Sequence, residues 1–178
     1  MKIVFVGGIH GVGKSTLCER IAAKSNVLHV KASSLIRDSS RNADTQDQKS
    51  VQDVAANQAI LVARFREVMN SCTARAILID GHFALGKPDG TTERVATEVF
   101  AALHVSSLVC LQDAPGSVAA RLRARDASAP EESYLALLQA TELEQAANVS
   151  QALGIRLTVV NALGVEGEAT VIAHLQAS

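Results

Sequence analysis

The segment over residues 8–16, with the sequence GIHGVGKST, constrains the fold of this chain more than any other feature. It fits the spacing G-x-x-x-x-G-K-[ST], and four residues occupy the fixed positions: Gly8, Gly13, Lys14 and Ser15. Before it, residues 2–6 form an apolar, β-branched run typical of a buried strand; after it, residues 17–23 predict the first turns of a helix. A strand, a glycine-rich loop and a helix in this order predict a phosphate-binding loop.

The chemistry of this loop follows from what a polyphosphate offers, which is several negative charges and only acceptor oxygens. Backbone N–H groups that point into the loop, together with the positive end of the next helix, stabilise such a ligand. We expect Lys14 to reach the β- and γ-phosphates, the Ser15 hydroxyl to ligate Mg²⁺ and Thr16 to face the α-phosphate. The predicted nucleotide-binding residues of the loop are Gly8, His10, Gly11, Val12, Gly13, Lys14, Ser15 and Thr16.

The composition of the 178-residue chain narrows the possible partners. Its 48% of hydrophobic residues suffice for one domain with a sizeable core, and its net charge of −1 provides no basic field for nucleic acid or an anionic membrane. No apolar run reaches the ~18 residues that a membrane span needs. The three cysteines are widely spaced and suit a reducing cytoplasm. We expect a cytoplasmic monomer or small homo-oligomer that binds a small-molecule acceptor, and neither nucleic acid nor a membrane.

Apolar runs and helical patterns alternate along the rest of the chain. Further strands are predicted over residues 27–30, 76–79, 107–111 and 155–160. Helices are predicted over residues 33–41, 51–72, 92–103, 131–153 and 165–175 and after Pro115, with loops over 42–49 and 85–91. This alternation predicts an α/β fold, with a five-stranded parallel sheet and helices on both of its faces.

Polar side chains that directly follow the predicted strands mark one edge of that sheet. Asp80, Asp113 and Asn161 each come after such a strand, and ligands of parallel sheets bind at the carboxyl ends of the strands. Asp80 is therefore placed to hold Mg²⁺, usually through water, or to accept the proton of an attacking hydroxyl. The alternative for Asp80 is a helix-capping carboxylate without chemistry, and the glycine loop favours the metal role.

Three arginines at alternate positions lie on the helix that follows Pro115. Residues four apart share a helix face, so Arg121 and Arg125 can act together while Arg123 points elsewhere. Arginine forks suit the charge that phosphoryl transfer spreads over the equatorial oxygens. We therefore predict a short lid over residues 121–131 that supplies arginine in cis. A solvated basic face is the alternative.

A carboxylate lies on the apolar face of the helix predicted over residues 131–153. This residue, Glu142, is near Leu138 and Val149 in the helical pattern. A carboxylate among apolar side chains needs a partner. A buried arginine is the simplest partner, so we expect one.

Several short segments besides the loop carry a likeness to a known family. Residues 33–37 (SSLIR) are similar to a segment whose arginine grips an acceptor phosphate. Asp80-Gly81-His82, followed by residues 86–90 (GKPDG), is similar to an Asp-x-His motif and its Lys/Pro/Gly loop. Residues 121–126 (RLRARD) look like lid arginines. In these segments the chain resembles the nucleoside-monophosphate kinases of the P-loop proteins, and most of all the archaeal type of adenylate kinase.

This resemblance implies a single nucleotide-kinase-like domain over residues 1–178, with an acceptor-binding helical segment at about 31–72. It implies that Arg121 lies against the nucleotide base and that Arg125 contacts the transferring phosphates. The predicted catalytic residues are Lys14, Asp80, Arg121 and Arg125, the metal ligands are Ser15 and Asp80, and the acceptor-binding residues are Arg37, His82 and Lys87. The implied activity is Mg·ATP-dependent phosphorylation of a nucleoside monophosphate.

Two departures from the family keep other functions open. The lid is short, and the segment over residues 41–50 is polar rather than strongly charged, so the acceptor can differ from AMP. One alternative is a kinase of another small metabolite, such as a nucleoside, a sugar or a shikimate-like acceptor. Another is an ATP-binding switch or slow NTPase, favoured by the short lid because kinases exclude water. Arg37 favours a kinase, since a switch needs no acceptor-phosphate site. The sequence has no guanine-reading Asn-Lys-x-Asp stretch, which argues against a GTPase.

Overall fold

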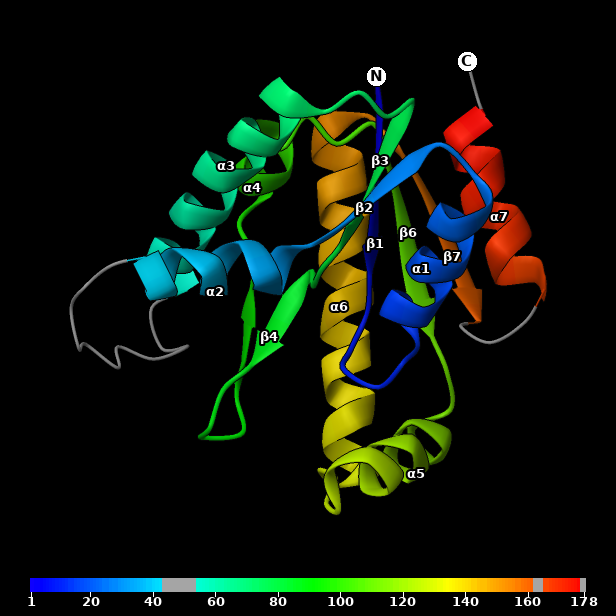
Figure 1. The fold of residues 1–178 in the computed structure, drawn as a ribbon. Coiled ribbons are helices and arrows are strands. Elements are labelled where there is room, and N and C mark those ends of the chain that lie inside the picture. The colour runs from blue at the N-terminus through cyan, green and yellow to red at the C-terminus, as the bar shows by residue number, and fades with distance from the viewer. Residues whose placement is uncertain (43–53, 162–164, 177–178) are drawn as a thin grey trace.

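The computed structural model describes residues 1–42, 54–161 and 165–176, which form a twisted sheet flanked by helices (Figure 1). Apart from residue 42, the loop expected over residues 42–49 lies outside the described residues. The same holds for the start of the helix expected from residue 51.

Five parallel strands form the main sheet in the order β2-β3-β1-β6-β7. Their bounds are β1 (Lys2–Gly7), β2 (Val27–Lys31), β3 (Ala76–Asp80), β6 (Ser107–Gln112) and β7 (Arg156–Asn161). Each lies on one of the five apolar runs of the sequence, so the predicted parallel sheet is confirmed. The central strand β1 is almost completely buried, because both of its faces are covered.

Helices cover both faces of this sheet, as the sequence predicts. Their bounds are α1 (Lys14–Lys24), α2 (Ala32–Asn42), α3 (Val54–Ser71), α4 (Thr97–Ala102), α5 (Pro115–Asp126), α6 (Glu132–Leu153) and α7 (Val165–Gln176). Side chains of α3, α4 and α6 pack with Ile3 and Phe5 of β1 on one face. Side chains of α1 and α7 pack with Val4 and Val6 on the other, and α5 joins this second cluster near the glycine loop.

An aromatic cluster supports the sheet directly beneath the site. The ring centroids of Phe5, Phe83 and Phe100 lie 4.9–5.4 Å apart. Two glycines leave room for it, because a Cβ at Gly7 would lie 2.2 Å from Phe83 and one at Gly81 would lie 2.7 Å from Phe5. The backbone between Gly81 and Phe83 is therefore fixed by the core, and this is the segment that presents His82.

A two-stranded hairpin corrects the sequence prediction for residues 84–94. The strands β4 (Ala84–Gly86) and β5 (Thr92–Arg94) pair antiparallel, where we expected a loop followed by a helix from residue 92. Only the later part of that segment, α4, is helical. The hairpin packs on α6, where the Tyr134 hydroxyl lies close to Gly86. This tertiary contact cannot be read from local periodicity in strands of three residues.

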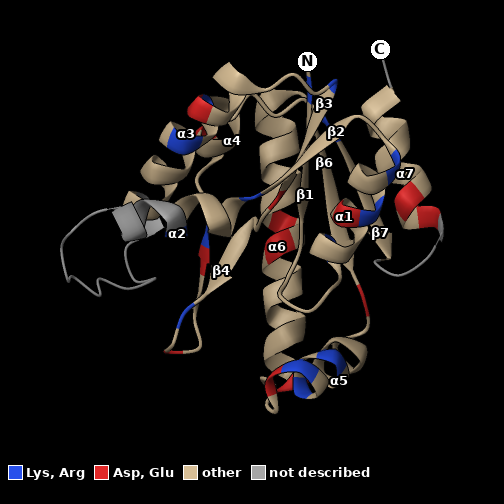
Figure 2. Ribbon diagram, viewed as in Figure 1, with Lys and Arg blue, Asp and Glu red and all other residues tan. Residues whose placement is uncertain are grey.

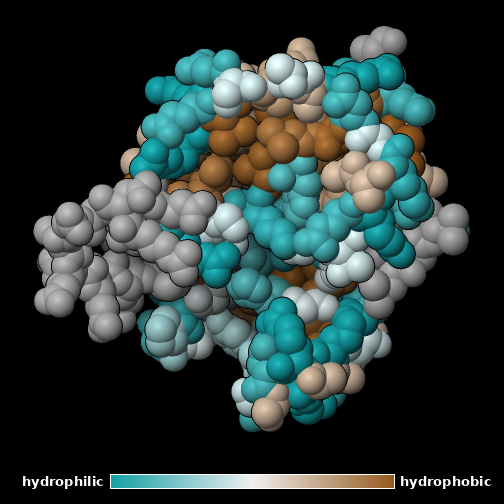
Figure 3. All heavy atoms as spheres, viewed as in Figure 1, coloured by the Kyte–Doolittle hydropathy of each residue, from teal (hydrophilic) through white to brown (hydrophobic). Residues whose placement is uncertain are grey.

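Polar residues surround the carboxyl ends of the strands, whereas apolar residues gather farther up the sheet. Figure 3 shows a hydrophobic area between α3 and α1 and a hydrophilic surface around the glycine loop and α5. Basic residues are concentrated on α5 (Figure 2). Within the described part of the chain, no helix is long and apolar enough to span a membrane.

Candidate functional site

The glycine loop connects β1 to α1, which is the strand, loop and helix order that the sequence predicts. Gly8 and Gly11 have φ values of 142° and 77°, a region that residues with a Cβ rarely adopt. A Cβ at Gly8 would also lie 2.6 Å from the Leu111 carbonyl oxygen. The loop can therefore keep this shape only with glycine at these positions.

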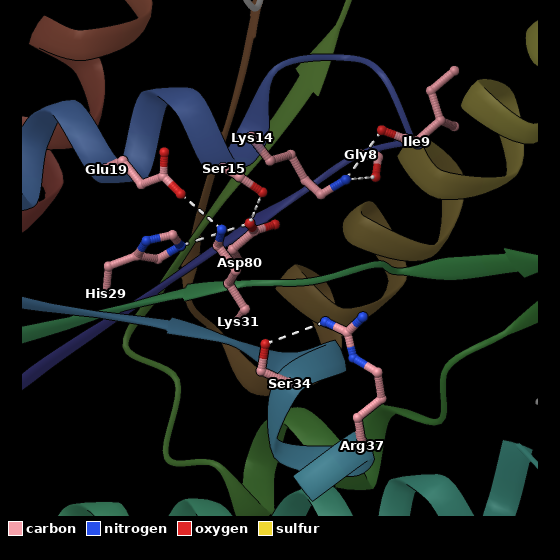
Figure 4. A network of polar contacts seen from close by, with 10 residues as sticks. All are labelled: Gly8, Ile9, Lys14, Ser15, Glu19, His29, Lys31, Ser34, Arg37 and Asp80. Carbon is pink, nitrogen blue, oxygen red and sulfur yellow. Dashed lines mark hydrogen bonds and ion pairs between the residues drawn. The ribbon is translucent and has the colours of Figure 1, made fainter. Parts of the chain in front are cut away.

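The Lys14 side chain turns back across the loop instead of reaching into solvent. Its ammonium donates to the carbonyl oxygens of Gly8 at 2.7 Å and Ile9 at 3.0 Å (Figure 4). Burial lowers the pKa of Lys14 below its ordinary value, although the charges of Asp80 and Glu142 oppose this shift. Anionic oxygens are stronger acceptors for an ammonium than carbonyls are, so a polyphosphate would compete well for this group.

Asp80 and Ser15 meet at the end of β3. The Ser15 hydroxyl donates to Asp80 Oδ2 at 2.5 Å, and His29 Nε2 lies 3.6 Å from the same oxygen (Figure 4). Burial alone would raise the pKa of Asp80. The nearby His29 ring, the hydrogen bond from Ser15 and the charge of Lys14 nevertheless hold it below its ordinary value. The carboxylate is therefore ionised.

This pair of oxygens fits a magnesium ion. Mg²⁺ is commonly held in phosphate sites by one or two protein oxygens, with phosphate and water completing its shell. Among the described residues, no group of three or more His, Cys, Asp or Glu could hold a metal. A hydroxyl and an ionised carboxylate beside Lys14 are thus the donor set available here.

A pocket of about 270 Å³ lies over the loop. It is lined by His10, Gly11, Gly13, Lys14, Ser15, Thr16, Arg121, Leu122 and Arg125. The helix α5 forms one wall, and a Cβ at Gly11 would lie 2.8 Å from Leu122. The loop and α5 are consequently in direct contact.

The three arginines of α5 differ in their surroundings. Arg121 Nε donates to the Gly11 carbonyl oxygen at 2.8 Å, and Arg121 Nη2 lies 2.7 Å from Asp113 Oδ2. Arg125 lines the pocket and pairs with Asp126, whereas Arg123 is exposed and does not line it. Arg121 therefore binds protein groups in this structure, and its contact with a nucleotide base stays a prediction.

Glu142 has different partners from the one expected, because no arginine of the described residues pairs with it. Its carboxylate is 1% exposed and accepts a hydrogen bond from the Phe83 backbone N–H at 2.6 Å. The other oxygen lies 2.9 Å from His82 Nδ1. The segment directly before β4 thus supplies both partners of this buried carboxylate, and the prediction of an arginine partner is wrong.

His82 connects this carboxylate to the glycine loop. Its ring centroid lies 4.6 Å from that of His10, a loop residue that lines the pocket. Partial withdrawal of the His10 ring from water lowers its pKa to about 4, and the like charges of His82, Lys14 and Arg125 add to this. A cation on His10 is therefore disfavoured, and the ring faces the pocket as a neutral imidazole at neutral pH.

The remaining predicted acceptor-binding residues lie farther from the loop. Arg37 is exposed on α2, with its guanidinium 3.5 Å from Ser34 Oγ, and Figure 4 shows it extending toward the side of the sheet that carries Asp80. Lys87 lies in the turn of the hairpin and pairs with Glu93. The structure thus gathers Lys14, Ser15, Asp80, Arg121, Arg125 and His10 around the loop, with His82 beside His10, and places Lys87 outside the pocket lining.

Two residues of this site were missed by sequence reasoning. His29 approaches Asp80 from β2, and Gln139 of α6 holds the backbone of Asp113 through hydrogen bonds of 3.0 Å and 2.9 Å. Neither belongs to a local motif. The register that pairs Lys31 with Asp80 brings His29 close, and a sequence alone does not reveal that register.

One segment of the chain is similar in sequence to part of a known protein. A segment of 45 residues is 47% identical to the UMP-CMP kinase of Sus scrofa. This segment covers 25% of this chain and 23% of that protein. The match therefore spans less than a quarter of that relative's length.

Two solved structures share the fold at low identity. One is a gluconokinase from Sinorhizobium meliloti 1021, with a TM-score of 0.52, 19% identity and coverage of 98% of this chain and 91% of that one. The other is a shikimate kinase from Bacteroides thetaiotaomicron, with a TM-score of 0.56, 17% identity and coverage of 98% and 94%. Residues 7–135, well over half of the chain, match the sequence profile of the family described as "AAA domain". With its glycine loop, parallel sheet and flanking helices, the chain belongs to this family of P-loop proteins.

Proposed function

We propose that this protein is a Mg·ATP-dependent kinase that phosphorylates a small molecule. The observation that carries the proposal is the arrangement of three side chains at the glycine loop. Lys14 donates to the Gly8 carbonyl oxygen, and the Ser15 hydroxyl beside it donates to Asp80. The named relatives support it, because UMP-CMP kinase, gluconokinase and shikimate kinase are all kinases by name.

Each residue has a part in this proposed reaction. Lys14 would leave the Gly8 and Ile9 carbonyls to bind phosphate oxygens, while Ser15 and Asp80 would hold Mg²⁺. When bound there, the ion would supply positive charge to offset the negative charge of the transferring group. Arg125 would contact the same group from the pocket wall. The protein's contribution is therefore positioning and electrostatic stabilisation.

For the phosphoryl acceptor, we propose a nucleoside monophosphate, which is what the resemblance of the sequence to adenylate kinases implies. The exposed guanidinium of Arg37 supports this, because an arginine fork matches a terminal phosphate. The local likeness to a UMP-CMP kinase supports it as well. The gluconokinase and shikimate kinase folds support the alternative, a kinase of another small metabolite.

We further propose a cytoplasmic protein, a monomer or small homo-oligomer, that does not bind nucleic acid or membranes. The net charge of −1 and the three free thiols, Cys18, Cys72 and Cys110, support this.

The test is ADP release by the purified protein with Mg·ATP, alone and with a panel of nucleoside monophosphates, nucleosides, gluconate and shikimate. We expect release to depend on one acceptor and to vanish in Lys14→Ala. Turnover of a monophosphate that requires Arg37 would support the leading acceptor; turnover of a phosphate-free acceptor would replace it. Slow ADP release that no acceptor stimulates would favour an ATP-binding switch instead.

A further inference from the structure

Glu142 and His82 form a hydrogen-bonded pair beside the pocket. The roles proposed above for Lys14, Ser15 and Asp80 in binding Mg·ATP do not involve this pair. Glu142 lies on α6, sixty positions after His82 in the chain, and its side chain is 1% exposed. The His82 side chain is 17% exposed, so one part of its ring remains accessible. The His10 ring, which lines the pocket, lies next to it, with the two ring centroids 4.6 Å apart.

The hydrogen bonds of Glu142 determine which nitrogen of His82 carries a proton. The Phe83 N–H can only donate, and it uses one carboxylate oxygen at 2.6 Å. The second oxygen, 2.9 Å from His82 Nδ1, is left as an acceptor when the carboxylate is ionised. A neutral His82 must then carry its proton on Nδ1, and Nε2 at the opposite edge of the ring becomes a hydrogen-bond acceptor.

We propose that Glu142 is a positioning residue that fixes His82 as a hydrogen-bond acceptor for a hydroxyl or amino group of the phosphoryl acceptor. The inference rests on the proposed function, because it assigns His82 to the acceptor side of a kinase site. The core holds both partners in place, since Phe83 packs against Phe5 and Phe100. A ring fixed at Nδ1 and packed beside His10 presents its Nε2 edge in one direction.

The chemistry of this edge restricts the substrate. A bare imidazole nitrogen attracts an O–H or N–H and repels the oxygens of a phosphate dianion, which carry no proton. His82 therefore reads a donor group of the acceptor molecule, while phosphate recognition is left to cationic groups such as Arg37. An acceptor molecule that lacks a hydroxyl or amino group at this place would be a poor substrate.

The substitution Glu142→Gln gives a sharp test without any substrate. The carboxamide oxygen must face the Phe83 N–H, so the amide NH₂ faces His82 Nδ1 and requires that nitrogen to be bare. We expect ¹⁵N NMR of histidine-labelled protein at pH 8.5 to show the proton of His82 on Nδ1 in the wild type and on Nε2 in Glu142→Gln. The variant His82→Asn assigns the signal. A proton on Nε2 in the wild type, or an unchanged tautomer in Glu142→Gln, would overturn the proposal.

Kinetics with the acceptor identified by the panel provide the second readout. We expect Glu142→Gln to lower kcat/KM for the acceptor roughly tenfold or more and to leave the KM for ATP within about twofold. In a His82→Ala background, Glu142→Gln should add no further loss, because Glu142 acts through His82. An additive loss, or an equal rise in the KM for ATP, would contradict this role.

A matched control comes from the same helix. Gln145, also buried, donates its side-chain amide to the Val95 carbonyl oxygen at 2.7 Å. Gln145→Met should lower the melting temperature without changing kcat/KM for the acceptor. If the protein proves not to be a kinase, the NMR result still stands on its own, so the failure of the proposed function and the failure of this inference are distinguishable.

Discussion

At the scale of single residues, Asp80 connects the proposed magnesium site with the stability of the fold. Its pKa is lower in the folded protein than in the unfolded chain, so its ionised form stabilises the fold. This contribution is fully present above the unfolded pKa of about 3.9 and is lost as the pH falls through the lower folded value. Asp80→Asn should therefore weaken the decline in melting temperature below about pH 4.

Thermal unfolding of both proteins between pH 2.5 and 7 measures this effect. The same variant should also shift the magnesium dependence of activity far more than ATP affinity measured without metal, because the carboxylate is the expected metal ligand. A normal magnesium titration in Asp80→Asn, together with the altered stability profile, would assign Asp80 a structural role only.

At the scale of elements, the contact between the glycine loop and α5 is the first to test. Gly11 and Gly90 both have positive φ, but a Cβ at Gly11 would meet Leu122 at 2.8 Å, while one at Gly90 has nothing within 4 Å. Alanine at Gly90 should cost only the backbone strain, about 1–2 kcal/mol. Gly11→Ala should cost more and weaken Mg·ATP binding. Denaturant unfolding measures the loss of stability, and calorimetric titration measures Mg·ATP binding. Equal losses of stability in Gly11→Ala and Gly90→Ala would mean that α5 moves aside for the added methyl group at no cost.

The arginines of α5 should separate by helix face. We expect Arg125→Ala to lower the rate constant of phosphoryl transfer, because Arg125 lines the pocket. Arg121→Ala should mainly weaken nucleotide binding, since Arg121 holds the Gly11 carbonyl and Asp113. Arg123→Ala should be close to silent. Steady-state and single-turnover kinetics distinguish these effects, and three equal losses would contradict the assignment by face.

The elements also show which features of the fold a sequence reveals. The five apolar runs and the glycine loop are local signals, and each one is a strand or loop in the structure. The β4–β5 hairpin is not, because its short strands are stabilised by α6 rather than by their own pattern. Glu142 was recognisable as a buried carboxylate, but its partners lie 59 and 60 residues away and depend on how α6 docks.

At the scale of the whole molecule, nucleotide binding should appear as thermal stabilisation. A ligand at 100 times its Kd adds about 2.7 kcal/mol to the free energy of unfolding, which for a chain of this size is roughly 5–10 °C in melting temperature. We expect this rise with Mg·ATP in the wild type and little of it in Lys14→Ala. An unchanged melting temperature and unchanged amide exchange of the loop at saturating Mg·ATP would contradict the assignment of the donor site.

The distance along the chain between His82 and Glu142 has a consequence for the order in which a newly made protein becomes complete. The glycine loop, β3 and α5 all precede residue 142 in the chain. The residues proposed to bind Mg·ATP are therefore synthesised before Glu142. At about 5–20 residues per second, the 60 residues from His82 to Glu142 take roughly 3–12 s to synthesise. During that interval, the Phe83 N–H and the His82 ring lack their carboxylate partner, and the part of the core that α6 later covers is exposed to solvent. A chain stalled in this window would carry its donor groups but would be a natural client for chaperones until α6 emerges.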